Sequence, residues 1–152
     1  MKTTDELVKY SQDIISGKIV SCKKHKWACQ RFLNDLERQS TEAFPYVFSE
    51  EKAELFFAWM RLFKHTKGPM AGKFKEPELI EKFIFGNVFG WVHQGTGTRR
   101  FRKAYWQVAR KNAKSQDLAI TGLFGLAADE EPYADIYIAA TKKEQTRYVW
   151  GE

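Results

Sequence analysis

Lys114 and Ser115, which follow Ala113, have the residue types found at the end of a phosphate-binding loop, G-x-x-x-x-G-K-[ST]. In such a loop the lysine contacts the outer phosphates of a nucleotide, and the adjacent hydroxyl binds Mg²⁺. Neither glycine of the pattern is present, because Val108 occupies its first position and Ala113 its sixth. On the pattern alone, a basic surface loop at the end of a strand is the more frequent interpretation.

A phosphate loop must lie between a buried strand and the start of a helix, and the surrounding sequence predicts both elements. The aromatic and apolar run at 101–109 is typical of a strand, and the apolar spacing over 114–128 predicts a helix. A second strand is predicted at 135–141, and Thr141 with Glu144 forms a capping-box pattern for a final helix. This order of elements predicts the beginning of a parallel α/β sheet.

The N-terminal region, residues 1–92, is predicted to consist of helices. Apolar residues recur there at steps of three and four in four successive stretches. Ser49 is predicted to cap the third helix, with acidic residues in its first turn, and Gly68 to end it. We therefore expect helices over 1–92, followed by a first βαβ unit over 93–152.

The composition predicts a folded, basic protein. Of its 152 residues 43% are hydrophobic, 15% are aromatic and the formal net charge is +6, with an isoelectric point near 9.3. The aromatic content predicts an aromatic-rich core, and the basic balance is compatible with a nucleotide or nucleic-acid partner. No apolar run reaches the roughly 18 residues of a membrane span, so no membrane segment is expected. Two cysteines without a secretory signal indicate a reducing compartment.

Several stretches in combination resemble the N-terminal part of the large terminase subunit of tailed double-stranded-DNA bacteriophages. Together they extend over nearly the whole chain. They are "SGKIVSCKKHKWACQRFLNDLER", "FSEEKAELFFAWMRLFKHTKGPMAGK", "EKFIFGNVFGW", "GTRRFRKAYWQVARKNAKS" and "ADIYIAATKKEQ". That family carries a deviant Walker A motif, in which arginine and lysine precede a small residue and then Lys-Ser or Lys-Thr. The missing first glycine is therefore compatible with the family's form of the loop.

The resemblance implies a set of residues around ATP and Mg²⁺. Lys114 is the implied catalytic residue on the β- and γ-phosphates, and Ser115 is the implied Mg²⁺ ligand. The implied nucleotide-binding residues are Arg110, Lys111, Asn112, Ala113, Lys114, Ser115, Gln116 and Glu81.

Two of these positions depart from the family pattern. Ala113 stands where the family often has Gly, and alanine fits there without strain only if its φ is negative. Glu81, after Ile80, stands where the family tends to have the Trp-Gln pair that reads adenine. An ionised glutamate accepts hydrogen bonds but cannot donate an amide N–H.

The resemblance also implies a function, which is the packaging of viral DNA into procapsids by an ATP-hydrolysing motor in the host cytoplasm. The implied partners are double-stranded DNA, the portal protein, the small terminase subunit and further copies of the same chain. Family members continue through a Walker B strand and a nuclease domain, which this sequence lacks. We therefore expect a truncated ATPase domain that binds nucleotide but does not hydrolyse it alone.

Two other functions stay open from the sequence. The first is a non-catalytic basic helical module that binds DNA, for which a cluster before the first predicted strand is a candidate. That cluster consists of Arg99, Arg100, Arg102 and Lys103. One of these arginines could instead reach the nucleotide of a neighbouring subunit. The second function is that of an inactive remnant of a larger subunit.

A metal site is a further candidate in the N-terminal region. Cys22, His25 and Cys29 follow one another at i, i+3 and i+7 on a predicted helix, which could bring three ligands together. A fourth ligand is not evident and the neighbouring lysines oppose a cation, so a packed cysteine beside a solvated histidine is the more frequent interpretation.

Overall fold

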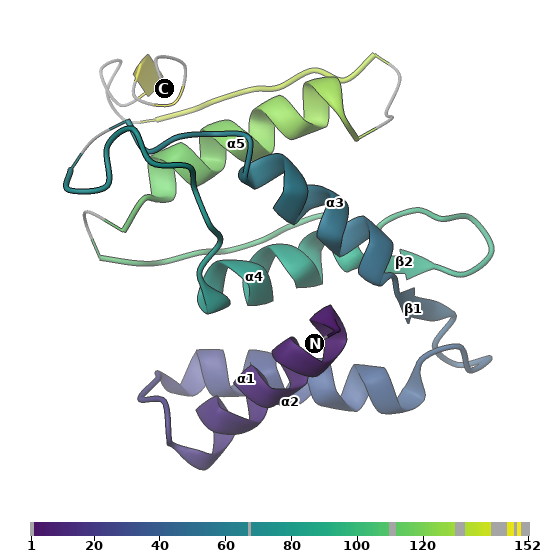
Figure 1. The fold of residues 1–152 in the computed structure, drawn as a ribbon. Coiled ribbons are helices and arrows are strands. Elements are labelled where there is room, and N and C mark those ends of the chain that lie inside the picture. The colour runs from purple at the N-terminus through teal and green to yellow at the C-terminus, as the bar shows by residue number, and fades with distance from the viewer. Residues whose placement is uncertain are drawn as a thin grey trace. The chain divides into compact units, whose positions relative to one another are not determined.

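The computed structural model describes residues 2–66, 68–109, 112–129, 133–140, 146, 147 and 149. Within this part the helices are α1 (Thr3–Ser16), α2 (Lys23–Arg38), α3 (Glu50–Met60), α4 (Leu79–Gly90) and α5 (Lys114–Ala127), and the strands are β1 (Tyr46–Phe48) and β2 (Trp91–His93) (Figure 1). Contacts divide the chain into two units. Unit 1 comprises Met1–Ala58 and Glu76–Ala104, and unit 2 comprises Trp59–Lys75 and Tyr105–Glu152.

The core of unit 1 is built from aromatic side chains around a two-stranded antiparallel sheet. β1 and β2 pair so that Phe48 lies opposite Trp91. The Trp91 side chain is fully buried, with edge-on contacts to Phe32, Phe44 and Phe48 at centroid distances of 5.5–6.3 Å. Such edge-to-face pairs add to the stabilisation from burial alone. The aromatic-rich core that the composition predicts is therefore present.

Gly90, at the end of α4, allows β1 to pass close to that helix. A Cβ atom at Gly90 would lie 2.6 Å from Cε2 of Phe48, which is closer than carbon atoms approach. The Gly90 carbonyl also accepts a hydrogen bond of 2.7 Å from the Ser49 N–H, immediately after β1. The absence of a side chain at this position thus sets how the helix and the sheet meet.

The predicted start of α3 is confirmed and its predicted end is wrong. The Ser49 hydroxyl accepts a hydrogen bond of 3.2 Å from the Lys52 N–H, as expected of a capping residue. The helix ends at Met60 and not at Gly68, because the chain then folds back on itself. The Lys75 N–H donates to the Phe63 carbonyl at 2.8 Å, and His65 pairs with Lys73 in the same way at 2.9 Å.

In unit 2, the helix predicted from residue 114 is present as α5. The Trp59 indole N–H donates to the Ile120 carbonyl at 3.1 Å, and its ring contacts Phe124. On α5, Cβ atoms added at Gly122 and Gly125 would lie 3.4 and 3.3 Å from the Ile136 side chain. Ile136 therefore packs on the side of α5 where Gly122 and Gly125 carry no side chain.

The two strands predicted on either side of α5 are not formed in the described residues. Neither 101–109 nor 134–140 belongs to a strand, because a strand requires a hydrogen-bonded neighbour and neither segment has one there. Burial nevertheless alternates with period two over 105–109 and over 134–138. The fold is thus mixed helical with a small antiparallel sheet, consistent with the α/β class. The capping pattern of the final predicted helix, at Thr141 and Glu144, lies outside the described residues.

None of the helices in the described part of the chain has the length and apolar character needed to cross a membrane.

Candidate functional site

The N-terminus of α5 presents hydrogen-bond donors together with two exposed polar side chains. The first bond inside the helix runs from the Asp117 N–H to the Ala113 carbonyl at 3.0 Å, and no side chain caps the helix at Ala113. The backbone N–H groups of residues 114–116 therefore have no acceptor within the helix. Lys114 and Ser115 are exposed at the same end. These donors, the helix dipole and the lysine charge all favour an anion at this position.

Ala113 adopts a left-handed backbone conformation, with φ of 49°. The expectation of a negative φ at this residue is therefore wrong. The conformation places Ala113 at the turn from which α5 begins, and that turn overrides the intrinsic preference of alanine. A side chain in this region costs roughly 1–2 kcal/mol relative to glycine, because Cβ crowds the following carbonyl oxygen.

Replacing Ala113 with Gly is expected to stabilise the protein. The relief of roughly 1–2 kcal/mol of backbone strain exceeds the loss of about 0.4–1 kcal/mol that comes from a more flexible unfolded chain. Thermal denaturation followed by circular dichroism measures the change. The matched control is Ala127→Gly at the exposed end of α5, where helical geometry makes glycine destabilising by up to about 1 kcal/mol. Equal destabilisation by both substitutions would contradict the role given to the Ala113 conformation.

The other predicted loop residues are only partly within the described structure. Asn112 is exposed, and its side-chain amide donates to the Ala109 carbonyl at 3.1 Å, which closes the turn before the helix. Arg110 and Lys111 lie outside the described residues. The Gln116 amide donates to the Lys64 carbonyl at 2.7 Å, so this side chain attaches the first turn of α5 to the segment that follows α3.

A buried ion pair lies one residue further along α5, and sequence reasoning missed it. The Lys75 ammonium lies 2.8 Å from a carboxylate oxygen of Asp117, and their side chains are 2% and 0% exposed. Gln116 and Asp117 are thus both held by the segment between α3 and α4. The sequence carries no local signal for this pair, because Lys75 is one of several lysines in a polar stretch and its partner is distant in the chain.

Glu81 lies in unit 1, whereas the loop lies in unit 2, and it acts there as part of a helix cap. Its carboxylate accepts a hydrogen bond of 2.9 Å from the Glu78 N–H, and together the two residues form a capping box at the start of α4. The Glu81 side chain is buried. The predicted adenine contact of Glu81 therefore stays a prediction.

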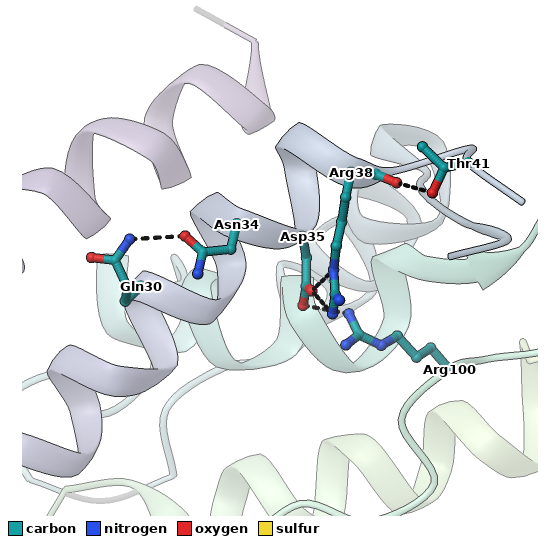
Figure 2. A network of polar contacts seen from close by, with 6 residues as sticks. All are labelled: Gln30, Asn34, Asp35, Arg38, Thr41 and Arg100. Atoms are coloured by element: carbon teal, nitrogen blue, oxygen red, sulfur yellow. Dashed lines mark hydrogen bonds and ion pairs between the residues drawn. The ribbon is translucent and has the colours of Figure 1, made fainter. Parts of the chain in front are cut away.

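The basic cluster of Arg99, Arg100, Arg102 and Lys103 lies in unit 1, and part of it is packed into that unit. Arg100 is 15% exposed, and its guanidinium lies 2.5 Å from the buried carboxylate of Asp35, which also binds Arg38 at 2.7 Å (Figure 2). The Arg100 N–H also donates to the Trp91 carbonyl at 2.9 Å. Arg102 and Lys103 are exposed. Arg100 is therefore held in place as a structural residue, which does not suit an arginine that reaches another subunit.

The cysteines and histidine of α2 and its N-terminus do not form a metal site. No group of three or more His, Cys, Asp or Glu side chains among the described residues is placed to hold a metal ion. Cys29 is buried, and burial raises the pKa of its thiol to about 11. The His25 ring contacts Tyr10 and Phe83, and burial lowers its pKa. The interpretation of a packed cysteine thus agrees with the described structure, whereas that of a solvated histidine is wrong, because His25 is half-buried against the two aromatic rings.

A comparison with known protein families finds a match for the C-terminal part of the chain. Residues 80–152, just under half of the chain, match the model of the family described as terminase large subunit, ATPase domain. The match begins within α4 and includes the loop and α5. It confirms the resemblance for this segment, while residues 1–79 lie outside it. No curated protein and no solved structure matches the chain.

Proposed function

We propose that this chain is a nucleotide-binding segment of a viral DNA-packaging motor. The proposal builds on the match of residues 80–152 to the ATPase domain of the terminase large subunit. One observation carries the proposal. The N-terminus of α5 combines backbone N–H groups without intrahelical acceptors and the exposed Lys114 and Ser115. The resemblance implies the family's phosphate loop at this position.

Each part of this site has a role in binding MgATP. The Lys114 ammonium pairs with the β- and γ-phosphate oxygens, and the N–H groups of residues 114–116 surround them. The Ser115 hydroxyl would hold the Mg²⁺ ion that accompanies the nucleotide and neutralises its phosphate charge. Arg110, Lys111 and Asn112 are the other residues proposed to contact the nucleotide in this loop. The hydrogen bond from the Gln116 side chain to the Lys64 carbonyl holds the first turn of the helix in place for this contact.

The finer architecture proposed is that of a P-loop ATPase over 93–152, preceded by a helical region over 1–92. The period-two burial of 105–109 and 134–138 supports strands at these positions once neighbouring strands are present. Both strands would then belong to one parallel sheet, with α5 on its face. Glu81 is the proposed acceptor for the exocyclic amine of adenine in such a complete site.

Binding of nucleotide, not its hydrolysis, is the activity proposed for this segment. Hydrolysis needs one carboxylate that holds the metal ion and another that activates water. Asp117 is the described carboxylate closest to Lys114 along the chain, and it is buried against Lys75. Double-stranded DNA, the portal protein, the small terminase subunit and further copies of the chain are the proposed partners, in the host cytoplasm.

Replacing Lys114 with Ala is expected to weaken MgATP binding by at least tenfold. A charge-assisted contact of this kind contributes about 1.5–3 kcal/mol, which corresponds to a factor of roughly 10 to 100 in the dissociation constant. Isothermal titration calorimetry with the full chain measures this change.

Lys73→Ala provides the control for the loss of one positive charge, because Lys73 is an exposed lysine of the same unit. It is expected to leave the affinity unchanged. The proposal is wrong if the unmodified chain does not bind MgATP, or if the two lysine variants bind it equally well.

A further inference from the structure

An open groove of about 460 Å³ follows the exposed side of α2, in unit 1. The residues that line it recur at steps of three and four, so one side of the helix presents all of them. They are Trp27, Gln30, Arg31, Asn34, Asp35 and Arg38. Figure 2 shows Gln30, Asn34, Asp35 and Arg38 along this helix, with Arg100 reaching Asp35 from a neighbouring segment.

The groove carries an excess of positive charge. Its acidic residue, Asp35, is buried and binds two guanidinium groups, those of Arg38 at 2.7 Å and Arg100 at 2.5 Å. Arg31 adds a further cation beside them. Partial desolvation of the guanidinium first, and then repulsion from Arg100, lower the pKa of Arg31, while attraction to Asp35 acts in the opposite direction. An anion in the groove would compensate both effects, so the charge distribution favours an acidic ligand.

The groove also carries an exposed aromatic ring and amide groups. The Trp27 residue is 59% exposed, although the Lys23 ammonium lies 4.9 Å from the centre of its ring. The Gln30 amide donates to the Asn34 side chain at 2.9 Å, and both residues are exposed on the same side of the helix. Exposed indole, amides and arginines together suit a ligand that offers flat rings as well as phosphates.

We propose that this groove binds single-stranded nucleic acid, with bases stacked on Trp27 and phosphates paired with Arg31 and Arg38. Basic grooves with exposed aromatic rings bind single strands in this way, because every base has a face that can stack. An acidic peptide would satisfy the arginines but would leave the indole without a stacking partner. The bases of a duplex are already stacked on one another, so a duplex would engage the charges alone. This function is separate from nucleotide binding at Lys114.

Fluorescence anisotropy of the full chain with a labelled single-stranded oligothymidylate of roughly 12 nucleotides tests the proposal. Trp27→Ala is expected to weaken binding about tenfold, since stacking on an aromatic ring changes affinity by a factor of roughly 5 to 150. Arg31→Ala is expected to lower the slope of log affinity against log salt by about one. Lys114→Ala is expected to leave binding unchanged, which separates this site from the nucleotide site.

The control variant is Lys24→Ala, an exposed lysine of α2 that does not line the groove. It is expected to change the affinity less than twofold. Trp27 is exposed, so its replacement should leave the thermal midpoint unchanged, and this is measured alongside. Equal losses for Trp27→Ala and Lys24→Ala would overturn the proposal in favour of diffuse charge. Binding of a duplex of the same length as tightly as the single strand, with no effect of Trp27→Ala, would overturn it in favour of duplex binding.

Discussion

Replacing Lys75 with Met is expected to lower the free energy of unfolding by about 3–5 kcal/mol, the loss that follows when one partner of a buried ion pair is removed. The Lys75 and Asp117 side chains are 2% and 0% exposed and lie 2.8 Å apart. Methionine has nearly the shape of lysine but no charge, so the buried Asp117 carboxylate loses the Lys75 ammonium. Urea denaturation followed by circular dichroism measures the change.

Two further variants separate the loss of charge pairing from loss of packing. The double variant Lys75→Met/Asp117→Leu removes both charges and is expected to recover most of the stability, because no isolated charge remains buried. Lys73→Met at an exposed position is expected to change stability by less than about 0.5 kcal/mol. If Lys75→Met behaves like Lys73→Met, the ion pair does not stabilise this unit as described.

Asp35→Asn is expected to cause a loss of about 3–5 kcal/mol in the same measurement. The Asp35 carboxylate is 1% exposed and neutralises Arg38 and the largely buried Arg100. Asparagine keeps the size of the side chain but removes the negative charge, which leaves two guanidinium groups beside each other. The cost is therefore dominated by the uncompensated charge and not by lost contact area.

Asp13→Asn is the matched control for this substitution. Asp13 also forms an ion pair, with Lys18 at 3.1 Å, but the lysine side chain is 68% exposed. Pairs of this kind contribute about 0–1 kcal/mol, because solvent screens them. Similar losses for Asp35→Asn and Asp13→Asn would show that burial of the Asp35 network has no special effect.

The helices could be predicted from the sequence because their signals are local. The cap at Ser49 and the start of α5 at Lys114 both depend on residues within one turn of the position concerned. The Lys-Ser pair could likewise be placed at a helix N-terminus before any tertiary contact was known. Its use by a nucleotide stays a prediction, which the family match of residues 80–152 supports.

The features that could not be predicted depend on partners distant in the chain. The run at 101–109 has the composition of a strand but is not one, because it has no paired neighbour among the described residues. Trp91–His93, in contrast, is a strand because it pairs with Tyr46–Phe48. The Lys75–Asp117 pair has the same nonlocal character. The positive φ of Ala113 reflects the geometry of the turn, which composition does not reveal.

The glycines of α5 bear on the order in which the protein acquires its structure. Each glycine inside a helix disfavours that helix by about 0.8–1 kcal/mol relative to alanine, and α5 has two of them beneath Ile136. A 14-residue helix with this composition does not persist in water as an isolated peptide. Its first turn, with the donors at residues 114–116, therefore forms only when the helix packs against Trp59 and Ile136. The proposed phosphate site is accordingly a product of tertiary folding, and we expect it to be lost whenever this unit opens locally.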